Sequence, residues 1–411
     1  MKAAAKWPSL PLTDAFWFQE GPGVRNWQFT TSGIKLLNVA NIEKGGTLNL
    51  EKTDRHLDET EVAKKYSHFL VDAGDLVIAS SGISFDDDGL LRTRGAFVRE
   101  ENLPLCLNTS TIRFKAIDGM SDLRFLKLWL NGREFRSQIT KFVTGTAQQN
   151  FGPSHLKATK ITLPPLAEQR RIAEVLDRAE ALRAKRRAAL AQLDSLTQSL
   201  FLDLFGDPAT NPKGWPCKPV GSLASKFSDG PFGSNLKSEH YTETGVRVIR
   251  LQNIGVGEFV DHDAAYISEH HFAKLQKHEC LAGDVLIGTM GDPNLRACIQ
   301  PKWLTIALNK ADCVLLRPDE RVANAIFICA LLNQPAAERM AQDLIHGQTR
   351  ARISMGRLRG LEVPVPPISL QREFARRVAA VEVLKTAQRA SLAELDALFA
   401  TLQHRAFRGE L

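Results

Sequence analysis

The chain has 411 residues, a formal net charge of +7 and a hydrophobic fraction of 44%. This composition is that of a soluble globular protein and excludes a disordered chain. No apolar run approaches the length of a membrane span, and the start MKAAAKWPSL lacks the apolar core of a signal peptide. We therefore expect a cytoplasmic protein with no membrane contact. Its basic charge favours an anionic partner, nucleic acid above all, with an enzyme of basic surface as the alternative.

The first 162 residues predict a compact α+β domain. Short β-like runs such as IKLLNV, DLVIAS and STIRF are bounded by Gly and Asp, and a helical stretch is expected over Leu123–Lys141. A polar, glycine-containing segment, Lys141–Lys157, follows. The double proline Pro164–Pro165 then opens a long helix, which we expect to end near Phe205.

The rest of the chain repeats this order. LPPLAEQRRIAEVLD from Leu163 matches VPPISLQREFARRVA from Val365 at an offset of 202 residues. GIKLLNVANI from Gly33 matches GVRVIRLQNI from Gly245, and DAGDLVIASSG matches LAGDVLIGTMG. A second helical stretch is expected over Ala323–Leu344. Because the matches are collinear, we interpret the chain as one unit of roughly 200 residues written twice.

The two long helices are predicted to pair with each other. In the first, apolar residues recur at alternating steps of three and four, which indicates a heptad seam, with the polar Arg186 at its centre. The seam runs through Ile172, Val175, Ala179, Leu182, Ala189, Leu193, Leu196 and Leu200. The second, less regular seam runs through Phe374, Arg377, Val381, Leu384, Gln388, Ser391, Leu395, Leu398 and Leu402. An antiparallel coiled coil, with the two domains at its two ends and related by a pseudo-twofold axis, is the expected arrangement. The predicted domains are residues 1–162, 163–206, 207–363 and 364–411.

Together these features resemble type I restriction–modification specificity subunits. The resemblance rests on the twice-occurring segment after the double proline, and on LFGDP and DGPFGSNLK, from Leu204 and Asp229. The second copy departs from the P-P-x-x-E-Q-R pattern, with Leu370 where the glutamate would stand. The family implies two target recognition domains and two spacer helices. It also implies a bipartite DNA target and no catalytic site in this chain. Partners would be double-stranded DNA, two adenine methyltransferase subunits using S-adenosylmethionine, and a restriction subunit driven by ATP with Mg.

The residues agree with a chain that needs no cofactor of its own. There is no phosphate-binding G-x-x-x-x-G-K-[ST] loop and no segment that would hold a flipped adenine. GTMGDP at 288–293 is expected to be a strand-ending turn, and His270–His271 a solvated helix face. The six cysteines lack metal-binding spacing and are expected to be reduced and mostly buried. A fragment of a single-chain restriction or modification enzyme, and a coiled-coil scaffold with no DNA role, remain as alternatives. A nuclease built from scattered acidic residues is not excluded by motif.

Two segments in each unit are candidates for reading DNA, since amide side chains can pair with adenine and arginine with guanine. The segments before the double proline are 141–157 and 346–359; the second pair are SSGISFDDDGLLRTRGAFVR and GTMGDPNLRACIQ. In the first unit the candidate residues are Arg92, Arg94, Lys141, Gln148, Gln149, Asn150 and Lys157. In the second they are Arg296, Arg350, Arg352 and Arg357, and Lys237 in FGSNLK is a further candidate, for a phosphate contact. A solvated loop whose charges serve solubility is the alternative for each.

Overall fold

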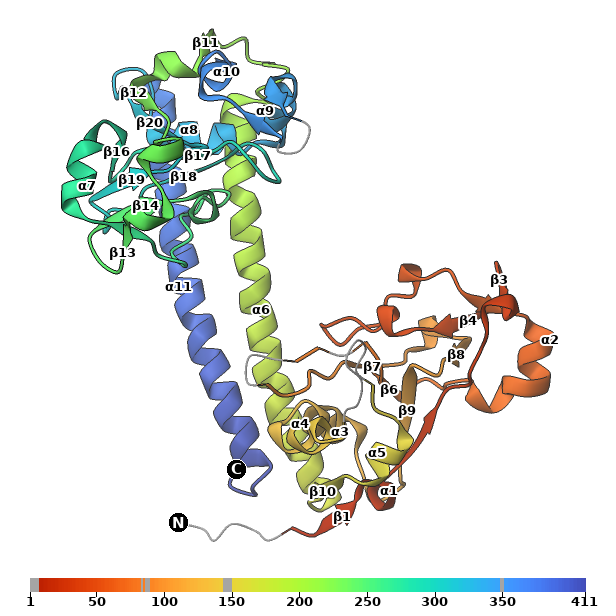
Figure 1. Cartoon of the computed structure of the whole chain (residues 1–411). Coiled ribbons are helices and arrows are strands. Elements are labelled where there is room, and N and C mark those ends of the chain that lie inside the picture. Colours follow the sequence, from red (N-terminus) through yellow and green to blue (C-terminus); the bar gives the residue numbers. More distant parts are fainter. Residues whose placement is uncertain (1–6, 83, 86–88, 143–149, 348–350) are drawn as a thin grey trace. The chain divides into compact units, whose positions relative to one another are not determined.

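The computed structural model describes residues 7–82, 84–85, 89–142, 150–347 and 351–411. The chain divides into two compact units (Figure 1). Unit 1 comprises residues 1–185 and 391–411, and unit 2 comprises residues 186–390. Each long helix therefore contributes one part to each unit.

Unit 1 is built on a four-stranded antiparallel sheet with the order β2-β9-β6-β7. A second sheet has the order β3-β5-β4-β8, and β1 pairs with β10. The strands are β1 Ser9–Pro11, β2 Phe16–Glu20, β3 Phe29–Thr30, β4 Ile34–Leu37, β5 His56–Leu57, β6 Leu76–Ala79, β7 Gly95–Phe97, β8 Leu105–Leu107, β9 Thr111–Ala116 and β10 Lys160–Thr162. The helices are α1 Leu12–Ala15, α2 Glu59–Glu61, α3 Leu123–Leu130, α4 Arg133–Thr140 and α5 Pro153–Lys157. The main core packs Trp129, Phe114 and Phe16 against Leu176 of the long helix.

Unit 2 repeats this plan. Its antiparallel sheet has the order β12-β20-β17-β18, strand for strand the order found in unit 1, and a second sheet has the order β13-β15-β14-β19-β16. The strands are β11 Cys217–Pro219, β12 Ala224–Ser228, β13 Tyr241–Thr242, β14 Val246–Ile249, β15 Tyr266–Ile267, β16 Glu279–Leu281, β17 Val285–Gly288, β18 Arg296–Ile299, β19 Ile306–Asn309, β20 Cys313–Pro318, β21 Ile345–His346, β22 Arg352–Ile353 and β23 Glu362–Pro364. The helices are α7 Glu269–Lys274, α8 Ala325–Leu332, α9 Pro335–Met340 and α10 Met355–Arg359. The predicted α+β class and internal repeat are confirmed.

The helical stretches expected over Leu123–Lys141 and Ala323–Leu344 are each two helices. The first breaks at Asn131–Gly132, between α3 and α4, and the second at Asn333–Gln334, between α8 and α9. A side chain at Gly132 would meet the Trp129 carbonyl oxygen at 3.1 Å, so the chain turns where it has no side chain to accommodate.

The long helices are α6 (Leu166–Phe205) and α11 (Ile368–Ala406), and each begins directly after its double proline. In unit 1, Arg183 of α6 donates to Asp396 near the end of α11 at 2.6 Å. In unit 2, Lys385 near the start of α11 lies 3.1 Å from the Asp194 carboxylate of α6. The early part of each helix thus meets the late part of the other, and the predicted antiparallel pairing is confirmed. No helix in the described ranges is both long and apolar enough to span a membrane.

The predicted apolar seam is wrong in the middle of the helices. Leu182 and Leu384 are 51% and 52% exposed, and Leu196 and Leu398 are 39% and 49% exposed. Residues one position later face the partner helix: Arg183 is half-buried and Lys385 is 7% exposed. A straight helix advances 3.6 residues per turn, so a strict 3.5-residue pattern drifts off the contact line.

Polar contacts replace the missing apolar seam and repeat with the chain's period. Arg183 joins Glu180 of its own helix to Asp396, and Lys385 joins Glu382 to Asp194. Each of the three positions recurs at an offset of 202. Arg186 and Gln388, also 202 apart, meet each other directly at 3.0 Å. The two central polar residues that the pattern singled out therefore pair.

The glutamine of the repeated motif fastens each long helix to its domain. Gln169 is fully buried; its oxygen accepts from the Asp122 amide at 2.9 Å, and its amide group donates to the carbonyls of Met120 and Pro164. Gln371 makes the same three bonds, to the Asn324 amide and to the carbonyls of Val322 and Pro366. Asp122 and Asn324 are the N-caps of α3 and α8. The glutamine thus links the long helix to the start of a domain helix.

Candidate nucleic-acid interface

The two candidate segments of unit 1 meet at one end of the main sheet. The chain leaving β6 passes Ser80, whose carbonyl accepts from the Phe151 amide of the later segment at 3.0 Å. The Leu91 amide donates to the Thr140 hydroxyl at 3.1 Å, and Arg136 donates to the Leu91 carbonyl at 2.8 Å. The first bond joins the two candidate segments, and the other two hold the earlier segment against α4, which leads directly into the later one.

Unit 2 joins its candidate segments at the equivalent point. Thr289 follows β17 as Ser80 follows β6, and its carbonyl accepts from the Ile353 amide at 2.9 Å. Met290 and Arg352 also form an antiparallel bridge. The candidate segments of the two units, which differ in sequence, thus occupy matching places on two matching sheets. β17 ends at Gly288, so GTMGDP is the predicted strand-ending turn.

Most of the described candidate residues of unit 1 are exposed to solvent. Arg92, Lys141, Asn150 and Lys157 are exposed. Arg94 is half-buried and donates to the Gly82 carbonyl at 3.2 Å. Gln148 and Gln149 lie outside the described residues.

The candidate DNA-reading residues of unit 2 have more varied surroundings than those of unit 1. Arg296 directs its guanidinium at four backbone carbonyls, those of Leu251, Ile254, Met290 and Pro293, at 2.7–3.1 Å. Those bonds use donors that a base would need, so Arg296 fits a structural role in the loop. The exposed Arg352 lies 3.5 Å from Asp312.

The remaining candidates of unit 2 are all exposed where they are described. Arg357 donates to the Leu344 carbonyl at 3.2 Å. Lys237 precedes the five-stranded sheet and lies 3.6 Å from Glu239. Arg350 lies outside the described residues.

Two carboxylates that lie beside the loop pairs are not among the residues predicted from the sequence. Glu20 ends β2, where burial raises its pKa, and it lies near Gly152 of the later segment. Asp229 directly follows β12; burial, aided by repulsion from Asp312, raises its pKa to about 6. A carboxylate accepts hydrogen bonds from cytosine N4, so both groups have chemistry suited to a base edge. Glu20 is the last residue of β2 and Asp229 is the first residue after β12, so the likeness of their positions is visible only once the two strands are aligned.

Exposed aromatic rings also gather at the loop pair of unit 1. Phe85 lies in the earlier segment and is 40% exposed, and Phe142 opens the later one and is 36% exposed. Phe142 stacks on His155 with nearly parallel rings, their centroids 6.2 Å apart. Such rings supply apolar contact surface beside the charged side chains.

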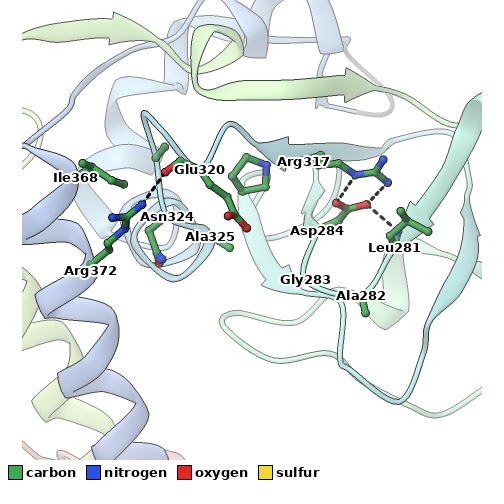
Figure 2. Close-up of a pocket in the computed structure, with 12 residues that line it drawn as sticks. Leu281, Ala282, Gly283, Asp284, Arg317, Glu320, Asn324, Ala325, Ile368 and Arg372 are labelled. Atoms are coloured by element: carbon green, nitrogen blue, oxygen red, sulfur yellow. Dashed lines mark hydrogen bonds and ion pairs between the residues drawn. The ribbon is translucent and has the colours of Figure 1, made fainter.

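A cavity of about 480 Å³ in unit 2 offers no obvious chemistry (Figure 2). Arg317 forms a two-pronged ion pair with Asp284 at 2.9 Å, and Arg372 donates to the Glu320 carbonyl. The Arg317 guanidinium and the Asp284 carboxylate are thus engaged with each other. Within the described part of the chain, no group of three or more His, Cys, Asp or Glu side chains is placed to hold a metal. Five of the six cysteines are buried free thiols, and Cys217 is exposed, as expected.

Residues 34–192 match the family model of the type I restriction modification DNA specificity domain. The EcoBI type I restriction enzyme specificity subunit of Escherichia coli is 22% identical over 338 residues, 75% of this chain and 70% of that subunit. The EcoKI specificity subunit of Escherichia coli strain K12 is 23% identical over 67% of this chain and 63% of that subunit. The chain is thus similar in sequence to type I specificity subunits. The resemblance predicted from the repeated motif is thereby confirmed.

Solved structures share the fold. A chain from a study of complex assembly and conformational transition in a type I R-M system matches with a TM-score of 0.60 and 18% identity over the full length of both chains. The S subunit of a type I system from M. genitalium matches with a TM-score of 0.54 and 17% identity, over 99% of this chain and 97% of that chain.

Proposed function

We propose that this specificity subunit reads a bipartite DNA target, one half-site per unit, and positions methyltransferase subunits on it. The observation that carries the proposal is the pair of loops at the same end of two equivalent sheets. The scaffolds match, whereas the loops differ in sequence and in exposed side chains. Two matching sheets that carry different polar loops are suited to recognising two different DNA sequences.

Within each unit the contacts divide into base reading and backbone positioning. In unit 1, Asn150 and the undescribed Gln148 and Gln149 are the proposed readers of adenine. Arg92, Arg94, Lys141 and Lys157 would hold phosphates or guanine. In unit 2, Arg352, Arg357 and the undescribed Arg350 would read guanine or bind phosphate, with Lys237 on phosphate.

The exposed leucines of the long helices supply matched docking positions for two copies of one partner. Leu182 and Leu398 belong to unit 1, next to the Arg183–Asp396 pair; Leu384 and Leu196 belong to unit 2, next to Lys385–Asp194. The two sets are the same positions displaced by 202. We propose that each set binds one methyltransferase subunit. S-adenosylmethionine would reside in those subunits, ATP and Mg in a restriction subunit, and no cofactor in this chain.

Exchange of a whole domain tests the one-domain-per-half-site arrangement. Residues 1–162 and 207–363 are the proposed recognition domains, and 163–206 and 364–411 the spacers. We expect replacement of residues 1–162 by the domain of another subunit to change one half-site of the methylated sequence and leave the other intact. Methylome sequencing of cells carrying the hybrid and its methyltransferase measures this. A change in both half-sites would refute the arrangement.

Stoichiometry tests the docking positions. Leu182→Glu should reduce the methyltransferase count from two to one in native mass spectrometry, and Leu384→Glu should do the same. Thr386→Glu, an equally charged change at an exposed polar position of α11, is the control and should retain two. Two bound copies in both leucine variants would contradict the assignment.

A further inference from the structure

Unit 1 contains a cavity of about 780 Å³ whose wall is rich in cations and glycine. It is lined by the loop around Gly45–Gly46, by β7, by α3 and by the long helices, all within unit 1. Five basic side chains line it against two acidic ones: Lys44, Arg94, Arg124, Lys127 and Arg183, with Asp177 and Glu180.

The acidic groups are already engaged. Asp177 accepts two hydrogen bonds from Arg124, at 2.9 and 2.6 Å, and Glu180 pairs with Arg183. Among the described residues, no carboxylate lies within ion-pair distance of Lys44, Arg94 or Lys127. Three positive charges therefore face the cavity without a direct counter-charge.

Lys127 is the least expected of these charges. Its side chain lies half-buried between Gly46 and the Phe97 ring, whose centroid is 5.4 Å from the ammonium nitrogen. Burial lowers the pKa of Lys127, and the more distant Asp177 and Glu180 only partly oppose this. A buried cation is unfavourable without a partner, and a single cation–π contact offsets only part of that penalty. An anion entering the cavity would supply the missing partner.

The feature is absent from the matching positions of unit 2. Residue for residue at the offset of 202, Cys329 stands where unit 1 has Lys127, Ile326 where it has Arg124, and Ala379 where it has Asp177. Cys329 is buried and bonded to the Ala297 carbonyl. Because the scaffold does not require a charge at this place in α8, the charges on α3 are a property of unit 1 alone.

We propose that this cavity is a phosphate-binding site, centred on Lys127, that takes one backbone phosphate of DNA bound to unit 1. The proposal rests on the proposed DNA-reading function, because Arg94 belongs to a candidate DNA-reading segment and also lines the cavity. The site gives unit 1 a sequence-independent anchor that unit 2 does not have.

The test compares full-length Lys127→Met with the wild type and with Lys274→Met. Lys274 is an exposed lysine of α7 in unit 2, so its substitution removes the same charge away from the cavity. Binding of a duplex oligonucleotide is measured by fluorescence anisotropy from 0.1 to 0.4 M salt. Loss of one phosphate contact lowers the salt slope by about 0.9, which corresponds to binding about 8-fold weaker at 0.1 M and about 4-fold weaker at 0.2 M. Lys274→Met should keep the wild-type slope.

Thermal unfolding separates a binding role from a structural one. Without DNA, Lys127→Met should melt at the wild-type temperature or above, because an unfavourably buried charge has been removed. Lower thermal stability together with unchanged DNA binding would identify Lys127 as structural and overturn the proposal.

Inorganic phosphate distinguishes the two sources of the anion. The Lys127 side-chain NMR signal, identified by its loss in Lys127→Met, should shift saturably with phosphate, and phosphate should compete with DNA. A saturable shift with unchanged DNA affinity in the variant would show a site for free phosphate and overturn the assignment to DNA. No shift and unchanged DNA affinity would overturn the site altogether. Failure of the wild type to bind any duplex would instead refute the proposed function.

Discussion

Replacement of Gln371 by alanine should destabilise unit 2 far more than a typical surface substitution. The buried side chain makes three hydrogen bonds, to the Asn324 amide at 2.9 Å and to the carbonyls of Val322 and Pro366 at 3.2 and 2.8 Å. Each bond contributes about 1 kcal/mol, and the abandoned N–H costs about 1–3 kcal/mol when no water replaces its partner. We expect a loss of about 3–5 kcal/mol in the free energy of unfolding of unit 2.

Hydrogen exchange with mass spectrometry measures this loss unit by unit. In Gln371→Ala, amides of α8 should exchange faster while those of α3 keep their wild-type protection. Gln169→Ala should give the mirror result, and Arg372→Ala, at an exposed neighbouring position, should affect neither. Equal loss of protection in α3 and α8, or wild-type protection in both, would refute the view that each glutamine fastens its own helix to its own domain.

The same position allows a pH test. In Gln371→Glu one carboxylate oxygen still accepts the hydrogen bond from the Asn324 amide. The other oxygen faces the carbonyls of Val322 and Pro366, so it must be protonated to donate a hydrogen bond to either. The pKa of this glutamate in the folded state should therefore be raised above its unfolded value. Stability is then greatest at low pH and falls as pH rises through the raised pKa. Protection of α8 in this variant should recover towards the wild type between pH 8 and pH 5; a pH-independent defect would contradict the geometry.

Two further predictions concern charge. Burial raises the pKa of Asp229 from its ordinary value of 3.8 to about 6 in the folded state, so its ionisation lowers stability as pH rises between those values. Asp229→Asn should raise the melting temperature at pH 8 and leave it unchanged at pH 4, where the wild-type group is largely neutral; a gain of equal size at both pH values would exclude ionisation as its cause. A fragment of residues 1–207 should form an antiparallel dimer in which Arg183 of one copy meets Asp194 of the other, the residue equivalent to Asp396. Arg186 would then face Arg186, so Arg186→Gln should tighten the dimer in sedimentation analysis, and a fragment that stays monomeric even with this change would contradict the pairing.

Much of the architecture could be predicted because it depends on local chemistry and on repetition. The double prolines set the starts of α6 and α11, and the Gly- and Pro-rich linker set the end of α6 near Phe205, since these residues act on the backbone where they stand. The offset of 202 predicted two equivalent folds, and Arg186 and Gln388 were correctly singled out as central. The resemblance to type I specificity subunits was accessible from the same repeated motif.

The side-chain environments depended on tertiary structure. The periodicity of Leu182, Leu196, Leu384 and Leu398 predicted burial, but the registry of two paired helices is set by every contact along them. That registry places Arg183 and Lys385 between the helices and the leucines outside. Similarly, the sequence shows Lys127 only as one lysine on an amphipathic helix.

The grouping of the candidate site was decided by the sheets. Segments some 50 to 60 residues apart meet because β6 and β17 end beside the returning chain, and hydrogen bonds from Phe151 and Ile353 hold them there. Because Arg94 and Arg296 are both arginines in matching segments, the sequence suggested equal roles for them. The Arg296 guanidinium, however, donates to four backbone carbonyls, whereas that of Arg94 donates to one. The sequence by itself determined which elements form and that they form twice, because helix starts and turns are set by neighbouring residues. Which charges remain available for a ligand was decided only by the fold, because a side chain's free donors depend on partners that are distant along the chain.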